Sequence, residues 1–331
     1  MPYPMPSPVA PPPPPRAGHP LRDAVLALPA PVRGTLAVSL LVTNTLACCL
    51  PLFVLALLRL LPLAAWRARL DPLLDAVART WVSGNSAWMR WTVPTTWQVN
   101  RLEGVSPKDT VLVVANHQSW VDIFVLQHLL NGRVPLLKFF LKRELLYVPV
   151  MGLAWWALGF PFMRRHSEEE LRRNPAKREQ DLREAERACA RFAQVPAAVM
   201  NFVEGTRFTP AKHRAGKGRF THLLQPKAGG LAVAVAVLGP RCRALVDATI
   251  VYADGAPSFW QFVCGRVPRI RVQLQALPLP PEMRQAGGRL DPALRRQVQR
   301  WLLELWQAKD ERIAALQAEL KSGPRPADST S

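Results

Sequence analysis

The chain has 331 residues, enough for one large domain or two small ones, and hydrophobic residues make up 49% of it. Its 43 lysines and arginines outnumber 24 acidic residues, giving a net charge of +19. Such a charge favours anionic partners such as lipid headgroups, nucleic acid or acidic carriers, without choosing among them. The five cysteines form no C-x-x-C pair, so the sequence supports neither a disulfide framework nor a zinc knuckle, and a reducing compartment is the simplest interpretation.

The N-terminal segment is dominated by proline, including the run Pro11 to Pro15. A segment of this composition cannot hold a helix and has little apolar surface to bury. We therefore expect residues 1–30 to form a disordered, proline-rich tail.

The next segment, Gly34 to Leu58, contains no charged residue. As a helix it would be about 37 Å long at ~1.5 Å per residue, more than the ~30 Å hydrocarbon core of a bilayer, which predicts a membrane helix. Asn44 and Pro51 lie inside it, so a straight span, a kinked helix and a re-entrant hairpin stay open. Basic residues flank both ends, and the positive-inside rule therefore orients the segment poorly.

A second helix is expected to begin at Asp71-Pro72, which is typical of an N-cap followed by proline at the first helical position. Its leucines and tryptophans fit two interpretations, a core helix or a helix on the membrane surface with its indoles at headgroup depth. We assign residues 31–95 to membrane-associated helices.

Residues 96–285 alternate short apolar runs with longer mixed segments. The alternation predicts an α/β domain, with a twisted, mixed but mostly parallel central sheet flanked by helices and preceded by the N-terminal membrane helices. The expected strands are Val111–Val114, Ala197–Val203, Leu231–Leu238 and Leu245–Tyr252, and the expected helices include Ile123–Leu130 and Glu168–Ala193.

Asp291-Pro292 repeats the N-cap and proline pattern and opens an amphipathic helix over Ala293 to Leu320. This helix either packs on the domain or touches the membrane. Residues 286–331 are therefore expected to hold a C-terminal amphipathic helix and a loose tail.

The most informative residues follow the first predicted strand of the domain. Asn116 to Asp122 contains an imidazole, His117, and a carboxylate, Asp122, five residues apart. In α/β folds, functional sites gather at the carboxyl ends of strands. An imidazole at this position is suited to proton transfer. Ser119 to Asp122 is also an S-x-x-D capping box, so Asp122 has a structural interpretation that does not exclude the catalytic one.

Four ordered segments resemble the motifs of the glycerolipid acyltransferase family, which includes bacterial and eukaryotic 1-acylglycerol-3-phosphate acyltransferases; we expect a bacterial member. Asn116–Asp122 is similar to its His-x4-Asp motif, Gly159–Arg165 to its aromatic-arginine motif, and Phe202–Arg207 to its Glu-Gly-Thr-Arg motif. Pro226–Val237 stands at the place of the fourth motif but departs from its common proline-ended form, resembling lysophospholipid and lysocardiolipin acyltransferases. The resemblance spans about Trp97 to Tyr252.

The resemblance implies an enzyme that moves a fatty acyl group to the free hydroxyl of 1-acylglycerol 3-phosphate, making phosphatidate. His117 would be the general base and Asp122 would orient its ring. The resemblance also implies a phosphate site, whose arginines suit bidentate binding of phosphate. Its residues would be Arg165, Glu204, Gly205, Thr206 and Arg207.

No cofactor or metal is expected, because His128, His166, His213 and His222 have no regular ligand spacing. Acyl-CoA or acyl-carrier protein would be the co-substrate. Membrane lipids would be the other partners, and no nucleic-acid partner is expected. The expected location is the inner membrane, with the catalytic domain facing the cytoplasm. The alternatives are the same chemistry on another lysophospholipid, a non-enzymatic basic protein that binds membranes, and a serine hydrolase, for which the chain lacks a G-x-S-x-G elbow.

Overall fold

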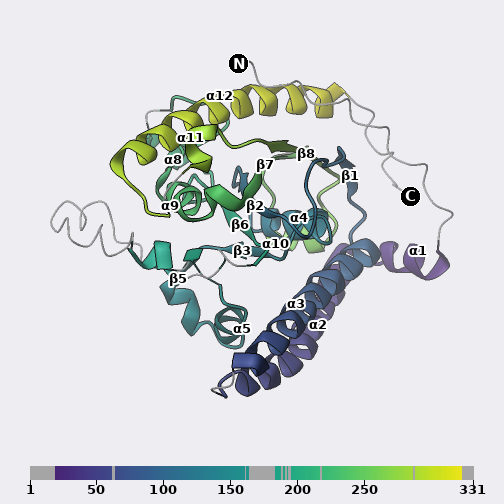
Figure 1. The fold of residues 1–331 in the computed structure, drawn as a ribbon. Helices are drawn as coiled ribbons and strands as arrows, with labels where there is room; N and C mark the ends of the chain where they lie inside the picture. Colours follow the sequence, from purple (N-terminus) through teal and green to yellow (C-terminus); the bar gives the residue numbers. More distant parts are fainter. Residues whose placement is uncertain are drawn as a thin grey trace.

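The computed structural model describes most of the chain (Figure 1). The described residues are 19–61, 64–160, 162–163, 183–187, 189–190, 192, 195–216, 218–285 and 288–322. Arg165, most of the predicted charged helix over 168–193, and the first eighteen residues of the predicted N-terminal tail lie outside them, as do residues 323–331 of the predicted C-terminal tail.

A six-stranded sheet forms the centre of the domain, in the order β1-β8-β7-β2-β6-β3. The strands are β1 (Thr96–Val99), β2 (Thr110–Ala115), β3 (Leu137–Phe139), β6 (Ala198–Asn201), β7 (Cys242–Tyr252) and β8 (Arg269–Leu277). Every neighbouring pair is parallel except β7 with β8. The predicted mixed, mostly parallel sheet flanked by helices is confirmed.

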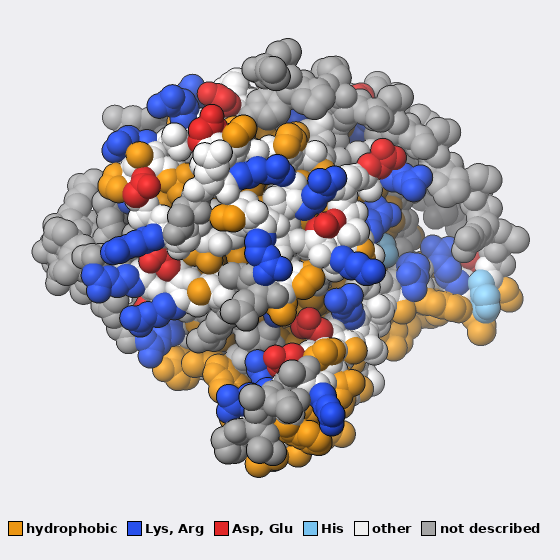
Figure 2. Space-filling model, viewed as in Figure 1, with side chains coloured by type: hydrophobic (Ala, Val, Ile, Leu, Met, Phe, Trp, Pro, Cys, Tyr) orange, Lys and Arg blue, Asp and Glu red, His pale blue; other side chains and the backbone are white. Residues whose placement is uncertain are grey.

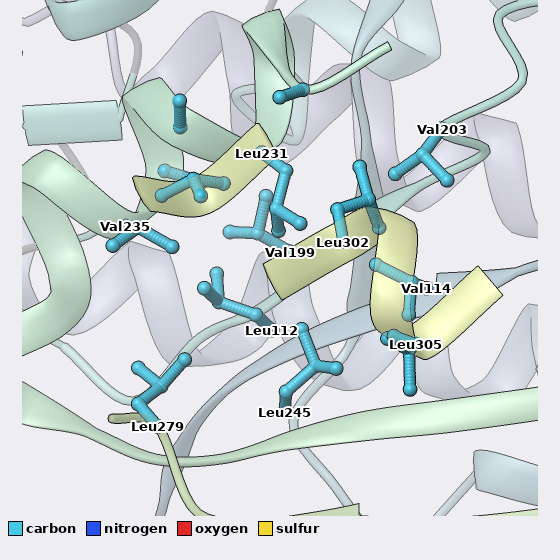
Figure 3. Packing of buried hydrophobic residues seen from close by; sticks show 14 of the residues in the cluster. Leu112, Val114, Val199, Val203, Leu231, Val235, Leu245, Leu279, Leu302 and Leu305 are labelled. Carbon is cyan, nitrogen blue, oxygen red and sulfur yellow. The ribbon is translucent and has the colours of Figure 1, made fainter. Parts of the chain in front are cut away.

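Strand β2 explains how the sheet is covered, because all six of its residues are buried. Leu112 and Val114 face a cluster that includes α9 (Gly229–Leu238) and the C-terminal helix α12 (Pro292–Ser322), as Figure 3 shows. Val111 and Val113 face the opposite cluster, with α4 (Val121–Leu130). Side chains of a strand alternate between faces, so an apolar run without alternation predicts burial on both faces.

The predicted strand over Leu231–Leu238 is wrong, since these residues form helix α9. The sequence Gly-Gly-Leu-Ala-Val-Ala-Val-Ala-Val-Leu is apolar all round, and nearly all of it is buried. Periodicity cannot separate a short buried strand from a short buried helix, and the valines favoured the strand. Packing against the sheet and against α12 stabilises the helix instead of a strand.

The C-terminal helix α12 packs on the domain, which settles the two alternatives left by the sequence. It begins at Pro292, and Asp291 caps it by accepting the N–H of Leu294 at 2.8 Å, as predicted. Leu302, Leu305 and Trp306 are fully buried in the cluster that covers β7 and α9. The helix therefore completes the hydrophobic core of the domain.

Two long N-terminal helices, α2 (Ala30–Leu58) and α3 (Ala64–Thr92), lie side by side and project from the domain (Figure 1). Helix α2 is the one helix of the described residues that is long and apolar enough to cross a membrane, and only 11% of its apolar window is buried. Hydrophobic side chains gather over this pair in Figure 2, whereas lysines and arginines are spread over the rest of that face.

Helix α3 begins earlier than predicted, and Pro72 lies inside it. Asp71 does not start the helix; from inside α3, its carboxylate forms an ion pair at 2.8 Å with Arg59, the residue that follows α2. The predicted disordered tail also ends too late, because Pro20–Leu26 form helix α1. Proline is compatible with the first helical turn, where its missing N–H would have no partner. Arg22 of α1 donates to the Arg90 carbonyl at 2.9 Å.

Short elements complete the described fold. They are β4 (Leu141–Lys142) paired with β5 (Phe162–Met163), η1 (Arg143–Tyr147), α5 (Met151–Ala157), α8 (Pro210–Ala215), η2 (Gly239–Arg241), α10 (Phe259–Val263) and α11 (Pro281–Arg284).

Candidate active site

The candidate site lies where parallel strands end at one edge of the sheet. Strands β2, β6 and β7 run in the same direction and end at Ala115, Asn201 and Tyr252. The segments after β2 and β6 carry the two motifs that the sequence singles out. Parallel strands place their carboxyl ends together, so residues nearly ninety positions apart meet there.

Asn116 fixes the start of the first loop. Its side-chain amide is fully buried, donates to the Ile250 carbonyl at 2.8 Å and accepts the Ile250 N–H at 2.9 Å. This pair of bonds replaces the backbone ladder just after β2 ends, because the side chain offers both a donor and an acceptor. The backbone entering His117 is therefore held against β7.

His117 and Asp122 form the pair that their spacing predicts. Nδ1 of His117 lies 2.9 Å from Oδ2 of Asp122, which is itself fully buried. Asp122 Oδ2 also accepts the N–H groups of Gln118 at 2.6 Å and Ser119 at 2.8 Å. An ionised carboxylate only accepts, so the ring carries its hydrogen on Nδ1 and leaves Nε2 as an acceptor. The capping and orienting interpretations of Asp122 therefore hold together in geometry.

Tyr252, which the sequence did not single out, completes the surroundings of Asp122. Its hydroxyl donates to Asp122 Oδ1 at 2.5 Å, and both groups are buried. Burial, together with the neighbouring Asp122 charge, raises the pKa of Tyr252 well above its ordinary value, so the hydroxyl stays a donor. The only sequence signal was its place as the last residue of a predicted strand.

Phe202 is a second contributor that sequence reasoning treated only as part of a motif. Its ring stacks on the imidazole of His117, with ring centroids 3.9 Å apart and planes inclined by 15°. The stacked ring limits rotation of the imidazole from one face, while Asp122 fixes it in its plane. The two contacts together hold His117 in one orientation.

Glu204 lies beneath the loop and binds backbone. Its Oε1 accepts the N–H of His117 at 3.1 Å, its Oε2 accepts the N–H of Leu224 at 3.0 Å, and the residue is only 3% exposed. Burial raises the pKa of Glu204 to about 8, although these hydrogen bonds and the positive charge of Lys309 oppose the rise. Its carboxylate connects the two motif segments.

Gly205, Thr206 and Arg207 follow on the surface of the same turn. Gly205 has a φ of +70°, a backbone conformation that is strained for residues with a side chain and unstrained for glycine. Its N–H donates to the Phe202 carbonyl at 2.9 Å. The Thr206 hydroxyl accepts from the Lys212 ammonium at 2.5 Å, and the Arg207 guanidinium lies 5.1 Å from the ring centre of the exposed Trp120. Two cations, Lys212 and Arg207, therefore lie at this turn.

A cavity of about 540 Å³ joins this turn to the N-terminal helices. His117 and Arg207 line one part of it, and Leu52 of α2, Trp81 of α3 and Ala154 of α5 line another. Most of its remaining lining is apolar. The cavity can therefore hold a long hydrocarbon chain while its polar part stays beside the imidazole.

The structure thus brings six of the seven predicted site residues together. His117, Glu204, Gly205, Thr206 and Arg207 belong to the two loops at this edge, and Asp122 lies in the first turn of α4. The Phe208 N–H donates to the His117 carbonyl at 2.7 Å and joins the two loops. Glu204 differs from expectation in that both its oxygens are bound to backbone N–H groups. Arg165 lies outside the described residues.

Comparisons with known proteins relate the chain to acyltransferases. Residues 96–252 match the family model described as Acyltransferase. The 1-acyl-sn-glycerol-3-phosphate acyltransferase gamma of Mus musculus is 29% identical over 217 residues, covering 61% of this chain and 52% of that protein. The delta form of Homo sapiens is 28% identical over 186 residues, covering 52% and 46%. The chain spans about half the length of the curated relatives it matches.

Among solved structures, the crystal structure of the 1-acyl-sn-glycerophosphate acyltransferase from Thermotoga maritima is 20% identical, with a TM-score of 0.42, covering 80% of this chain and 97% of that one. Residues 96–252 are thus similar in sequence to acyltransferases.

Glu204 predicts how stability depends on pH. The folded protein holds this proton up to about pH 8, whereas an unfolded chain releases it near ~4.3. The stabilising contribution is therefore fully present below the unfolded pKa and is lost as pH rises through the folded pKa, by up to about 1.4 kcal/mol per pH unit. Glu204→Gln cannot titrate, so its melting temperature should fall less than that of the wild type between about pH 5 and pH 8. Equal slopes in the two proteins would contradict the assignment.

Proposed function

We propose that the protein transfers a fatty acyl group from a thioester donor, acyl-CoA or acyl-carrier protein, to the free hydroxyl of 1-acylglycerol 3-phosphate, making phosphatidate. The observation that carries the proposal is the oriented imidazole of His117 at the wall of an apolar cavity, with the Arg207 guanidinium in the same lining. That lining offers a base, a place for an acyl chain and a cation for phosphate.

His117 acts as the general base in this mechanism. Nε2 takes the proton of the acceptor hydroxyl as its oxygen forms a bond to the thioester carbonyl carbon. The tetrahedral intermediate then collapses, the carbon–sulfur bond breaks, and the imidazolium returns the proton to the leaving thiolate. Asp122 stabilises the imidazolium through Nδ1. The thioester is already activated, so no covalent enzyme intermediate and no cofactor is required.

Arg207 binds the acceptor's phosphate in this proposal, because a guanidinium binds phosphate through two parallel hydrogen bonds. No carboxylate of the described residues forms an ion pair with it, and Lys212 adds a second positive charge at the Thr206 hydroxyl. Arg165 remains a proposed second phosphate ligand on the resemblance alone. Glu204 is better suited to hold the backbone of His117, because both its oxygens already accept backbone N–H groups.

The membrane provides the surroundings of the reaction. Helix α2 exposes large apolar side chains along its length, including Leu46, Leu50 and Leu57, each more than half exposed. We propose that this surface lies in the inner membrane, with the catalytic domain on the cytoplasmic side, where all five cysteines would stay free. Acyl chains would then reach the cavity along the α2–α3 pair.

His117→Ala tests the base directly. Membranes carrying the variant should form phosphatidate from 1-acylglycerol 3-phosphate and labelled acyl-CoA at least about 10²-fold more slowly than the wild type, because general-base catalysis typically supplies 10²–10⁴-fold. The same assay is repeated with acyl-carrier protein as donor, and His19→Ala, on an exposed residue before α1, is the control. An active, folded His117→Ala protein would refute the base. Product only with another lysophospholipid would change the acceptor and keep the chemistry.

Arg207→Ala should lower kcat/KM for the acceptor by about 10- to 100-fold, the size expected from losing a charged hydrogen bond, while the KM of the acyl donor changes little. Arg207→Lys should recover part of the loss because it keeps the charge without the planar fork. Arg296→Ala, on the exposed side of α12, is the control. Unchanged acceptor kinetics would remove Arg207 from the phosphate site.

Ala154 tests the acyl cavity. Ala154 and Ala157 lie one turn apart on α5 and are both buried in the same small cluster, but only Ala154 lines the cavity. Ala154→Leu should shift donor preference toward shorter acyl chains because it fills part of the cavity, whereas Ala157→Leu should leave the preference unchanged. Competition between donors of different length measures the shift, and identical profiles for both variants would place the chain elsewhere.

A further inference from the structure

One turn of the C-terminal helix α12 carries buried charges. Lys309 is 0% exposed and forms an ion pair with Asp247 of β7, and its ammonium donates to the Ala248 carbonyl at 2.7 Å. Arg312 pairs with the other oxygen of Asp247 at 2.8 Å. Buried charges lose hydration, so they are retained only where partners compensate for it. This turn therefore has a fixed geometry.

Asp310, beside Lys309, holds a loop. Its two carboxylate oxygens accept the N–H groups of Thr221 at 2.8 Å and His222 at 2.7 Å. Phe220 and Leu223 in the same segment are buried in the core, so the loop from 220 to 224 is fixed at several points. Backbone N–H groups form stronger hydrogen bonds to a charged acceptor than to a neutral one, so the Asp310 carboxylate holds this loop firmly.

The same loop reaches the site. Two residues beyond His222, the Leu224 N–H donates to Glu204 Oε2, and Glu204 Oε1 accepts the His117 N–H. A continuous series of carboxylate-to-backbone bonds therefore runs from Asp310 through the loop and Glu204 to the backbone of His117. Lys309 adds a positive charge that acts on Glu204 from the same turn of α12.

We propose that Asp310 is a positioning residue for His117, acting through the loop 220–224 and Glu204. The proposal rests on the proposed function of His117. It gives α12, which lies outside residues 96–252, a part in catalysis in addition to its part in the core. A displacement of about 1 Å at a reacting group can cost on the order of 10²-fold in rate, so small shifts of this loop have measurable effects.

The test uses the full chain in membranes or detergent. Asp310→Ala removes both acceptors, Asp310→Asn keeps one side-chain oxygen, and Glu319→Gln removes the ion pair between α12 and Arg271 of β8 without touching the loop. At a temperature where all variants are folded, kcat should fall about tenfold or more in Asp310→Ala and less in Asp310→Asn, with the acceptor KM within about twofold of wild type. Glu319→Gln should keep the wild-type kcat.

A second measurement separates this proposal from the proposed function. The chain has six histidines, and ¹⁵N-histidine NMR with His117 assigned through His117→Ala reports its ring without turnover. The His117 signals should move in Asp310→Ala and Asp310→Asn and stay in place in Glu319→Gln. Unchanged His117 signals, or a kcat loss no larger than that of Glu319→Gln, would overturn the positioning role. Signals that move in a protein inactive on every acceptor would keep the positioning and refute the transferase function.

Discussion

The carboxylate of Asp122 is buried without an arginine or lysine of the described residues beside it, so hydrogen bonds alone must offset its lost hydration. Four donors do so, from the ring of His117, the backbone of Gln118 and Ser119, and the hydroxyl of Tyr252. Each donor belongs to a segment whose position the sheet determines. A change in the relative placement of β2, α4 or β7 would leave a buried charge unsatisfied, at a cost of several kcal/mol. The pairing therefore selects one arrangement of the loops.

That arrangement explains why the cavity lies where it does. The loops of β2 and β6 put an imidazole and a guanidinium on one wall, and the α2–α3 pair with α5 supplies an apolar wall. Polar chemistry and a hydrocarbon chain need opposite surroundings, and a single cavity between a sheet edge and a membrane-type helix pair provides both. The Asn44 amide, which donates to Asn85 and to the Trp81 carbonyl, joins the two helices of that pair.

The sequence predicted the sheet, its two motif loops and the capped C-terminal helix because each has a local signal. Asn116 to Asp122 follows an unbroken apolar run, and Asp291-Pro292 is a helix start in its own right. Other features depend on contacts between distant segments. Nothing near Leu231 to Leu238 indicates that a helix rather than a strand is buried there, and Tyr252 acquires its role only because β7 pairs with β2. At Asp71, the helix begins upstream at Ala64 in spite of the capping signal, and the carboxylate pairs with Arg59 instead of capping.

Two buried carboxyl groups hold the segment around His117, and their surroundings differ. Asp122 accepts hydrogen bonds from four donors, one of them the imidazole, which suits it to hold a ring that becomes cationic. Glu204 has two backbone donors, and burial dominates, so its pKa is raised to about 8. A group that is easily neutralised is a poor counter-ion for an imidazolium, but it still accepts N–H bonds in a buried loop. The number and kind of hydrogen-bond donors therefore indicate that Asp122 stabilises the imidazolium, whereas Glu204 fixes the backbone of His117.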